Sequence, residues 1–365
     1  MNPRISLGRL LVGQTKAVEF LESWLADGTF PPLLFAGPAG VGKRTAALMV
    51  AQAANCLDPD HQPCGVCRSC RSIAGLGHPD LRLLLPIRLP KKDADIDDIA
   101  RTTLDRYPEF ALGRAQPVPD TKLKIPIDAV RWLRIEMARP PLLARLRLFL
   151  LIQAHQMNAE ATNALLKVLE EPQGQTSFIL TTSRPAALSA TIRSRCQTLR
   201  FSSIARDTLL SWLKESAGAS AADAELASAM AEGSIGTALR FLENREEFLV
   251  ASIVDYFAGR LGSSERAVAA AMDAAQDASP AAVAGTLLFL YRETLRIKLG
   301  GSSIYANKNP GVIEPNISRE AGYLRRAVKF LLSRSSDAGL NVNARLFNYT
   351  LLTTLKPPAR RRLPT

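Results

Sequence analysis

The sequence contains no apolar run near the roughly 18 residues that a membrane-spanning helix needs, which excludes a chain embedded in a membrane. The segment "MNPRISLGRL" lacks the apolar core of a secretory signal, so we expect a cytoplasmic protein with no membrane partner. Glycine and proline, at 22 and 23 of 365 residues, are too few for a chain that is disordered throughout. The length instead favours two or three folded domains.

The sequence has an excess of positive charge, with 46 lysines and arginines against 34 acidic residues. The formal net charge of +12 favours polyanionic partners such as nucleic acid or nucleotides. The basic residues are spread along most of the chain, however, so a solvated basic surface explains the charge nearly as well. The arginine run in the tail "KPPARRRLPT" is typical of a disordered end, and we assign it no site.

Short apolar segments alternate with amphipathic segments in the first part of the chain. The apolar segments are typical of strands buried on both faces of a parallel sheet, and they cover 31–36, 80–86, 146–152 and 177–182. The segments with helical periodicity cover 15–28, 43–55, 127–138 and 158–172. This alternation predicts an α/β fold, with a parallel sheet that carries helices on both faces.

Two parts of the chain depart from this alternation. Residues 87–124 are polar, contain proline and read as a surface insertion, with one helix near 96–107. Beyond residue 203 the strand signals end, and the pattern is helical up to residue 357. We expect one Gly/Asn/Pro-rich loop, at 300–316, to interrupt those helices.

Four of the five cysteines lie in one short segment, "CLDPDHQPCGVCRSC", as Cys56, Cys64, Cys67 and Cys70. Four thiolates at this spacing suit a tetrahedral zinc ion, and a site closed by four protein ligands is structural rather than catalytic. The alternative is a set of free or redox-active thiols, but a redox C-x-x-C pair would not need the other two cysteines. His61 could compete as a ligand, and His78 is a weaker candidate.

The segment "FAGPAGVGKRTAA" follows a predicted strand and opens a predicted helix, as a phosphate-binding loop does. Gly37, Gly40 and Gly42 allow the backbone to close around phosphates, and Lys43 can reach them. The next position should carry a Ser or Thr hydroxyl for magnesium, but it is Arg44. Thr45 is displaced by about 100° around the helix, which makes it a poor substitute.

The strand at 146–152 should end in a carboxylate that completes the magnesium site. It is followed by Gln153, Ala154 and His155, and the next acidic residue is Glu160. Because the hydroxyl and the carboxylate are missing together, we expect no ATP hydrolysis and no productive binding of ATP and Mg²⁺. Arg44 could place a cation beside the phosphates or point to solvent, and the sequence does not decide between these.

Several motifs together resemble bacterial clamp-loader subunits of the AAA+ class. The resemblance covers about residues 10–245 and lies in "GQTKAVEFL", the loop, the four cysteines, "NALLKVLEEP", "FILTTSRPAALSATIRSRC" and "EGSIGTAL". It implies an AAA+ α/β domain with a zinc module at 1–203, a small helical lid at 204–244 and an all-α oligomerisation domain at 245–365. Its degenerate nucleotide site distinguishes the chain from the gamma/tau members of the family, which keep their ATPase residues.

The resemblance also implies a role for Arg195, in the sequence "SRC". In the family this arginine contacts the γ-phosphate of ATP bound to an adjacent subunit, as an arginine finger in trans does. The chain would then be a stator in the DNA polymerase III holoenzyme, assembled with gamma/tau and delta subunits, while the sliding clamp is loaded on primed DNA. Thr181 and Thr182 lie where active members sense phosphate, and Gly236 lies near the place of a second sensing arginine.

Three alternatives remain open at this point. Arg195 could be an ordinary surface arginine in an ion pair. The chain could be an active ATPase motor that uses Thr45 and a distant carboxylate. It could also be a stand-alone zinc-containing DNA-binding protein. Cys196, the fifth cysteine, is best explained as a packed thiol.

Overall fold

A computed structural model describes residues 4–5, 7, 11–88, 123–170, 175–245, 248–335 and 343–357. These residues form two compact units. The first unit holds the described residues up to 217 together with 231–237, and the second holds 218–230 and the described residues from 238 onward. The three-domain division expected from the resemblance stays a proposal, because its lid segment is shared between the two units.

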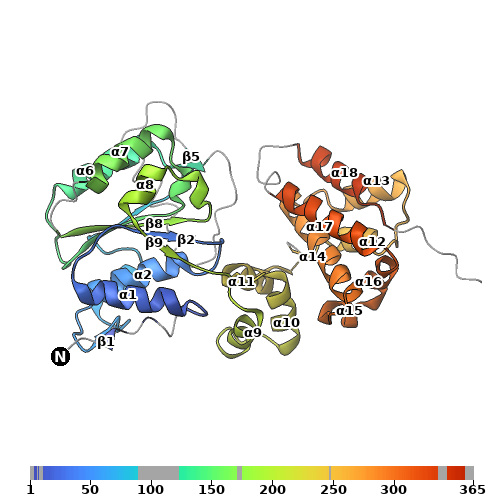
Figure 1. Cartoon of the computed structure of the whole chain (residues 1–365), viewed down its shortest axis with the longest axis horizontal. Coiled ribbons are helices and arrows are strands. Elements are labelled where there is room, and N and C mark those ends of the chain that lie inside the picture. The colour runs from blue at the N-terminus through green and yellow to red at the C-terminus, as the bar shows by residue number, and fades with distance from the viewer. Residues whose placement is uncertain are drawn as a thin grey trace, which may run out of the picture. The chain divides into compact units, whose positions relative to one another are not determined.

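The first unit is built on a five-stranded sheet with the strand order β4-β7-β8-β2-β9. Figure 1 labels three neighbouring strands of this sheet, β8, β2 and β9. The strands are β2 (Leu33–Ala36), β4 (Leu81–Leu84), β7 (Arg147–Leu151), β8 (Thr176–Thr182) and β9 (Gln197–Arg200). Every neighbouring pair is parallel, and Leu33 lies opposite Ile179 on one side and Gln197 on the other. The predicted α/β fold with a parallel sheet is therefore confirmed.

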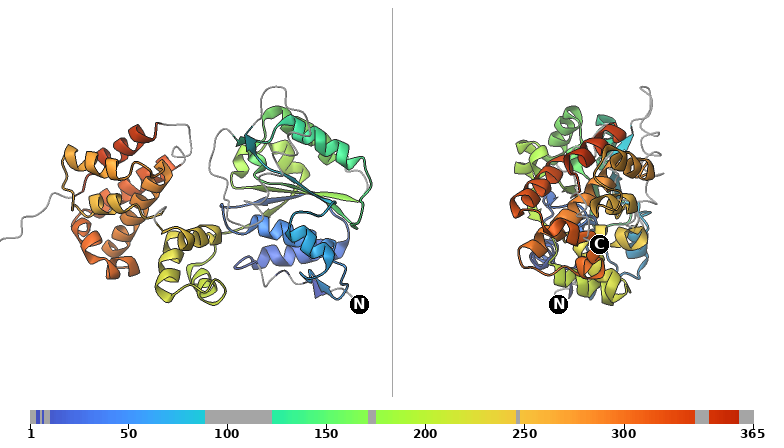
Figure 2. Two further views of the ribbon diagram at one scale, coloured as in Figure 1. Left: turned by 180° about the vertical axis from the view of Figure 1, so that it is seen from behind. Right: turned by 90° about the vertical axis from the view of Figure 1, so that its right-hand side faces the viewer.

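Helices cover both faces of this sheet, as the alternation of segments predicted (Figures 1 and 2). They are α1 (Thr15–Asp27), α2 (Lys43–Ala54), α6 (Ile127–Met137), α7 (Ala159–Glu170) and α8 (Ala190–Arg195). Leu33 and Phe35 point into a core with α1 and α2, whereas Leu34, between them, joins a second core with α6, α7 and α8. Side chains alternate across a strand, so one short apolar run supplies both cores.

Shorter elements connect the main ones. They are β1 (Arg4–Ile5), β3 (His61–Gln62), α3 (Arg68–Ala74), β5 (Ile87–Arg88), β6 (Leu123–Lys124), and two 3₁₀ turns, η1 (Ala154–Gln156) and η2 (Pro185–Ala187). The strands β5 and β6 pair antiparallel and bring the two ends of the predicted insertion side by side. The helix predicted near 96–107 lies outside the described residues.

The remaining elements are helical in the described part of the chain, as predicted. They are α9 (Arg206–Glu215), α10 (Ala221–Met230), α11 (Ile235–Glu243), α12 (Ala251–Phe257), α13 (Glu265–Ala274), α14 (Pro280–Lys298), α15 (Ile304–Lys308), α16 (Pro310–Ile317), α17 (Ala321–Ser335) and α18 (Ala344–Thr354). In the second unit, α14 supplies Val283, Leu287 and Leu290 to an all-helical core. No described helix is long and apolar enough to cross a membrane.

The loop predicted at 300–316 is wrong, because the segment forms α15 and α16. Pro310 stands at the first position of α16, where its missing N–H has no partner to lose. Val312 and Ile313 are buried in the core of the second unit, and this packing outweighs the local glycine and proline content.

Candidate nucleotide and metal sites

The predicted phosphate-binding loop, residues 37–42, is called the phosphate-type loop below. It connects the carboxyl end of β2 to the start of α2, as predicted. Gly37 starts the loop against the backbone, because a Cβ there would lie 2.1 Å from the carbonyl oxygen of Phe201. Its amide nitrogen donates to the carbonyl oxygen of Thr182 at 3.2 Å. Only glycine fits this position, so the need for glycine here has a local steric cause.

The side chain of Lys43 is hydrogen-bonded to the phosphate-type loop. Its ammonium group donates to the carbonyl oxygen of Gly37 at 2.6 Å and also to that of Pro38. The residue is 9% exposed, and burial lowers the pKa of its ammonium group to about 8. The lysine therefore holds the loop together through the loop's own carbonyl oxygens.

The carbonyl oxygens of Gly40 and Val41 also have partners within the chain. The amide nitrogen of Gly236, in α11, donates to the carbonyl oxygen of Gly40 at 2.9 Å. The side chain of Gln14 donates to the carbonyl oxygen of Val41 at 3.4 Å and to that of Ser202 at 2.7 Å. Contacts from two distant segments thus hold the loop without any ligand.

Arg44, at the hydroxyl position, and Thr45, the next residue, differ in their surroundings. Arg44 is half-buried, and burial lowers the pKa of its guanidinium group. Thr45, which follows Arg44 in the same helical turn, is exposed. The sequence-based expectation that Thr45 makes a poor substitute for the missing hydroxyl stays consistent with this placement.

His155 lies in η1, the short turn that follows the carboxyl end of β7. Its Nδ1 atom lies 3.0 Å from the hydroxyl oxygen of Thr182, and burial lowers the pKa of His155 to about 4. The positive charges of Arg184, Lys43 and Lys124 lower that pKa further. The electrostatic surroundings therefore disfavour a divalent cation at this position.

The carboxyl ends of β7 and β8 are joined by a hydrogen bond. Gln153 has a left-handed backbone, with φ of 54°, and its amide nitrogen donates to the hydroxyl oxygen of Thr181 at 3.1 Å. Thr181 and Thr182 are both buried. Glu160, the next acidic residue along the chain, is exposed in the first turn of α7.

The four cysteine sulfurs lie within 4.8 Å of one another, as the spacing predicted. The Sγ atoms of Cys56 and Cys70 are 3.7 Å apart, and the edge of a tetrahedron with Zn–S bonds of about 2.3 Å is about 3.8 Å. The amide nitrogens of Cys64, Cys67 and Cys70 each donate to the sulfur of the preceding cysteine, at 3.3–3.4 Å. The donor set and its spacing fit a metal ion such as zinc.

Helices hold the cluster from both sides. Cys56 follows α2, and the sulfur of Cys67 caps the start of α3. Gly65 makes the tight turn between them with φ of 75°, a backbone conformation that favours glycine. Burial opposes ionisation of Cys67, but hydrogen bonds from the amide nitrogens of Cys70 and Leu57 outweigh it and lower its pKa to about 6.

Neither histidine belongs to this cluster. The side chain of His61 is 75% exposed and lies 3.7 Å from Asp58. The Nδ1 atom of His78 accepts a hydrogen bond from the amide nitrogen of Asp80 at 3.1 Å. Cys196 is 7% exposed, and burial raises the pKa of its thiol to about 12, as expected for a packed thiol.

Arg195 is the last residue of α8, and its side chain is 32% exposed. Ser189 caps the start of this helix by accepting from the amide nitrogen of Ile192 at 3.3 Å, and Ile192 is fully buried. The guanidinium group donates to the carbonyl oxygen of Thr191 at 3.1 Å and forms an ion pair with Glu170. The helix is thus fixed by packing, while the arginine head lies at the surface.

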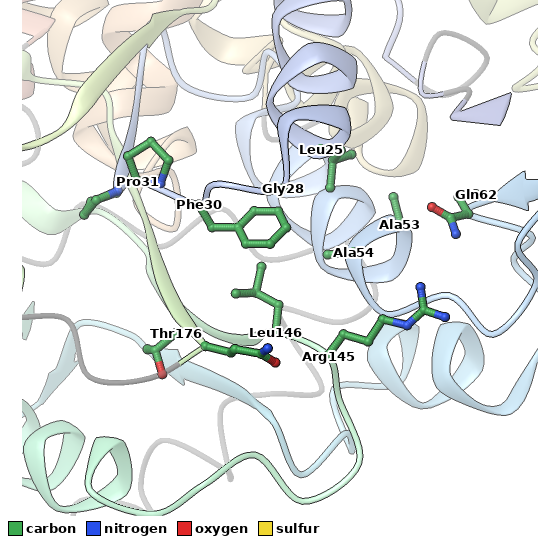
Figure 3. A pocket seen from close by; sticks show the side chains of 12 residues that line it. Leu25, Gly28, Phe30, Pro31, Ala53, Ala54, Gln62, Arg145, Leu146 and Thr176 are labelled. Carbon is green, nitrogen blue, oxygen red and sulfur yellow. The ribbon is translucent and has the colours of Figure 1, made fainter. Parts of the chain in front are cut away.

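A pocket of about 700 Å³ lies at the other end of the sheet (Figure 3). Figure 3 shows Phe30, Leu146 and Arg145 among the residues of its wall. Thr176, also in the wall, begins β8, so the pocket is at the amino ends of the strands. Lys43 and the residues around it follow the carboxyl ends, so this pocket is separate from the phosphate-type loop.

Residues 13–205 match the family model described as "DNA polymerase III, delta subunit". The chain belongs to this family. The resemblance to clamp-loader subunits is therefore confirmed.

Two relatives from Bacillus subtilis (strain 168) agree with this family. The chain is 34% identical to DNA polymerase III subunit delta' over 168 residues, which are 46% of the chain and 41% of the relative. It is 24% identical to DNA polymerase III subunit tau over 314 residues, which are 79% of the chain and 50% of the relative. The chain therefore spans half or less of the length of these relatives.

Solved structures show only a distant likeness. The crystal structure of a DNA polymerase III, gamma subunit-related protein from Thermotoga maritima has a TM-score of 0.43 and 16% identity, with 92% of this chain and 98% of that chain covered. A TM-score this low supports no conclusion about function.

Proposed function

We propose that this chain is a non-hydrolysing stator of the bacterial replicative clamp loader. In this role it presents Arg195 to ATP bound by a neighbouring gamma/tau subunit. It assembles with gamma/tau and delta subunits, and the assembly loads the sliding clamp on primed DNA. The observation that carries the proposal is the sequence after β7, where an ATPase needs a carboxylate: Ile152, Gln153, Ala154 and His155 follow the strand, and His155 is hydrogen-bonded to Thr182.

Hydrolysis of ATP requires magnesium to be held beside the phosphates and a water molecule to be positioned for attack. Arg44 replaces the hydroxyl that would bind the ion, and none of residues 152–155 after β7 is acidic. The positive charges around His155 would repel a divalent cation rather than attract it. Both losses act on the same step, so restoring one of them alone would not restore turnover.

The contacts of the loop support a rigid role. Lys43, Gly236 and Gln14 all donate to carbonyl oxygens of the loop, and these contacts need no nucleotide. A subunit that moves with its own ATP cycle must exchange such contacts when nucleotide binds. A stator has no need of that exchange, because its neighbours bind the nucleotide.

Arg195 has the chemistry for action in trans. Its guanidinium group is always charged and can donate to two phosphate oxygens at once. Ile192 anchors α8 in the core, so the arginine is displayed from a fixed base. Arginine fingers are worth about 10³–10⁵ in rate in other phosphoryl-transfer systems.

We also propose that Cys56, Cys64, Cys67 and Cys70 bind a structural zinc ion. Four thiolates leave no open position for water, so the ion would stabilise the fold and take no part in chemistry. The segment 204–244 would form the lid, and residues 245–365 would form the oligomerisation domain.

Reconstitution tests the proposal. The purified chain is mixed with gamma/tau and delta subunits, and the mixture is analysed by gel filtration and by ATP turnover. We expect a mixed complex that hydrolyses ATP, and no turnover by the chain alone. Magnesium-dependent turnover by the chain alone at about 1 s⁻¹ or faster would instead favour the motor. Failure to form a complex would favour a stand-alone DNA-binding protein.

A further inference from the structure

Glu170 occupies an unusual position for an acidic residue. It is the last residue of α7, where the negative end of the helix dipole disfavours a carboxylate. It is exposed and packs into no core, so it makes no hydrophobic contribution to the helix end. Its partner is Arg195, which comes from a different helix and lies 25 residues further along the chain.

The ion pair uses the same donors that a phosphate would need. One guanidinium nitrogen of Arg195 donates to Glu170, and the other donates to the carbonyl oxygen of Thr191. The head group therefore lies back against its own subunit. A phosphate oxygen can replace the carboxylate as acceptor of this N–H group, and a phosphate beside the carboxylate would be disfavoured because two anions so close repel each other.

Only the arginine side chain is free to exchange partners, because α8 itself is fixed. Ile192 is fully buried, and Leu188 and Cys196 at either end of the helix are also buried in the same core. An exchange of partners by the side chain needs rotamer changes but no movement of the helix.

We propose that Glu170 is a positioning residue that holds Arg195 in a withdrawn state until a nucleotide-bearing neighbour offers a phosphate. This inference rests on the proposed function of Arg195. Release from Glu170 is then part of nucleotide binding at the shared site. The carboxylate opposes the engagement of ATP and leaves the chemical step unchanged.

The test is the substitution Glu170→Gln, which removes the charge and keeps the shape, in the complex reconstituted with gamma/tau and delta subunits. An exposed ion pair contributes about 0.2–1 kcal/mol, so we expect the KM for ATP to fall by about 1.5- to 5-fold. We expect kcat to stay unchanged. Glu160→Gln, an exposed acid at the other end of the same helix, is the matched control and should leave both constants unchanged.

A double-mutant cycle with Arg195→Ala tests this inference separately from the proposed function on which it rests. The fall in KM caused by Glu170→Gln should disappear when Arg195 is already alanine. If Arg195→Ala lowers turnover but Glu170→Gln leaves KM unchanged, or lowers kcat instead, Glu170 is not such a residue and the proposed function stands. If Arg195→Ala has no effect, the proposed function itself fails.

A measurement on the isolated chain gives a second readout. The guanidinium protons of Arg195 should exchange with water more slowly in the wild type than in Glu170→Gln, as observed by NMR, because the carboxylate holds them. Equal exchange rates in the two proteins would overturn the inference.

Discussion

The amide nitrogen of Gly236 donates a hydrogen bond to the carbonyl oxygen of Gly40 at 2.9 Å. This contact joins the start of α11 to the phosphate-type loop through backbone atoms alone. Active members of the resembled family carry a sensing arginine near Gly236, which would reach a nucleotide from that place. In this chain the backbone of Gly236 itself bonds to the loop, so the contact does not depend on a ligand.

The first prediction concerns nucleotide binding by the isolated chain. Because Arg44 replaces the hydroxyl that would bind magnesium and no acidic residue stands between β7 and Glu160, ATP with Mg²⁺ at about 1 mM should raise the free energy of unfolding by less than about 0.5 kcal/mol. Thermal unfolding with and without Mg·ATP measures this. A magnesium-dependent stabilisation of several kcal/mol would show a working nucleotide site and contradict the prediction.

The second prediction concerns the cysteine cluster. The wild-type chain should contain about one zinc ion, and Cys67→Ser should lose most of it and unfold at a lower temperature. Metal analysis by mass spectrometry and a melting curve provide the two readouts. Cys196→Ser is the matched control, since this buried thiol lies outside the cluster, and it should retain the zinc. Equal zinc content in both variants would refute the assignment.

The third prediction concerns a buried ion pair at the amino ends of β4 and β7. Asp80 and Arg147 are each 1% exposed, with 2.9 Å between carboxylate and guanidinium. The carboxylate also accepts from the amide nitrogens of Leu142, Leu143 and Ala144, at 2.7–2.9 Å. Asp80→Ala leaves the buried cation uncompensated and should cost about 3–5 kcal/mol in the free energy of unfolding.

A surface pair provides the control for Asp80→Ala. Asp128 and Arg131 are 2.8 Å apart, but both side chains are more than a third exposed. Asp128→Ala should therefore change the free energy of unfolding by no more than about 1 kcal/mol in urea titration. Similar effects of the two substitutions would contradict the buried-pair account.

The pH dependence of stability provides a fourth prediction. Burial of Asp80 opposes ionisation, but the amide nitrogens of Leu143 and Leu142 and the side chain of Arg147 outweigh it, so its pKa lies below 3.8. Because the folded pKa is the lower one, the stabilisation is present above the unfolded pKa and is lost as pH falls through the folded value. The stability of Asp80→Ala should therefore fall less steeply than that of wild type below about pH 4. Parallel pH curves for the two proteins would be evidence against this contribution.

Much of the fold follows from periodicity in the sequence. The four predicted strands and the helices between them correspond to β2, β4, β7 and β8 and to α1, α2, α6 and α7. The strand β9 was missed because only Leu199 among its four residues is buried, so its segment carries no apolar run. Its place beside β2 is set by the sheet rather than by its own composition.

The candidate sites, like the fold, could be predicted from the sequence only in part. The spacing of the cysteines predicted their cluster because neighbouring residues on a turn are forced together. Sequence reasoning identified the missing acid after β7 but could not predict the bond between His155 and Thr182, whose partners are 27 residues apart. It also could not identify Glu170 as the partner of Arg195, because surface ion pairs between helices leave no pattern in the sequence.

The most direct measurement of the central claim is ATP turnover by the complex reconstituted with Arg195→Ala. Arg193→Ala is the matched control, because this exposed arginine is on the same helix and donates to the carbonyl oxygen of Pro185. We predict that both complexes assemble, and that Arg195→Ala lowers turnover by about tenfold or more at the neighbouring site while Arg193→Ala has no effect. Equal turnover by the wild-type and Arg195→Ala complexes would contradict the claim that this chain contributes its arginine to a neighbour's ATP.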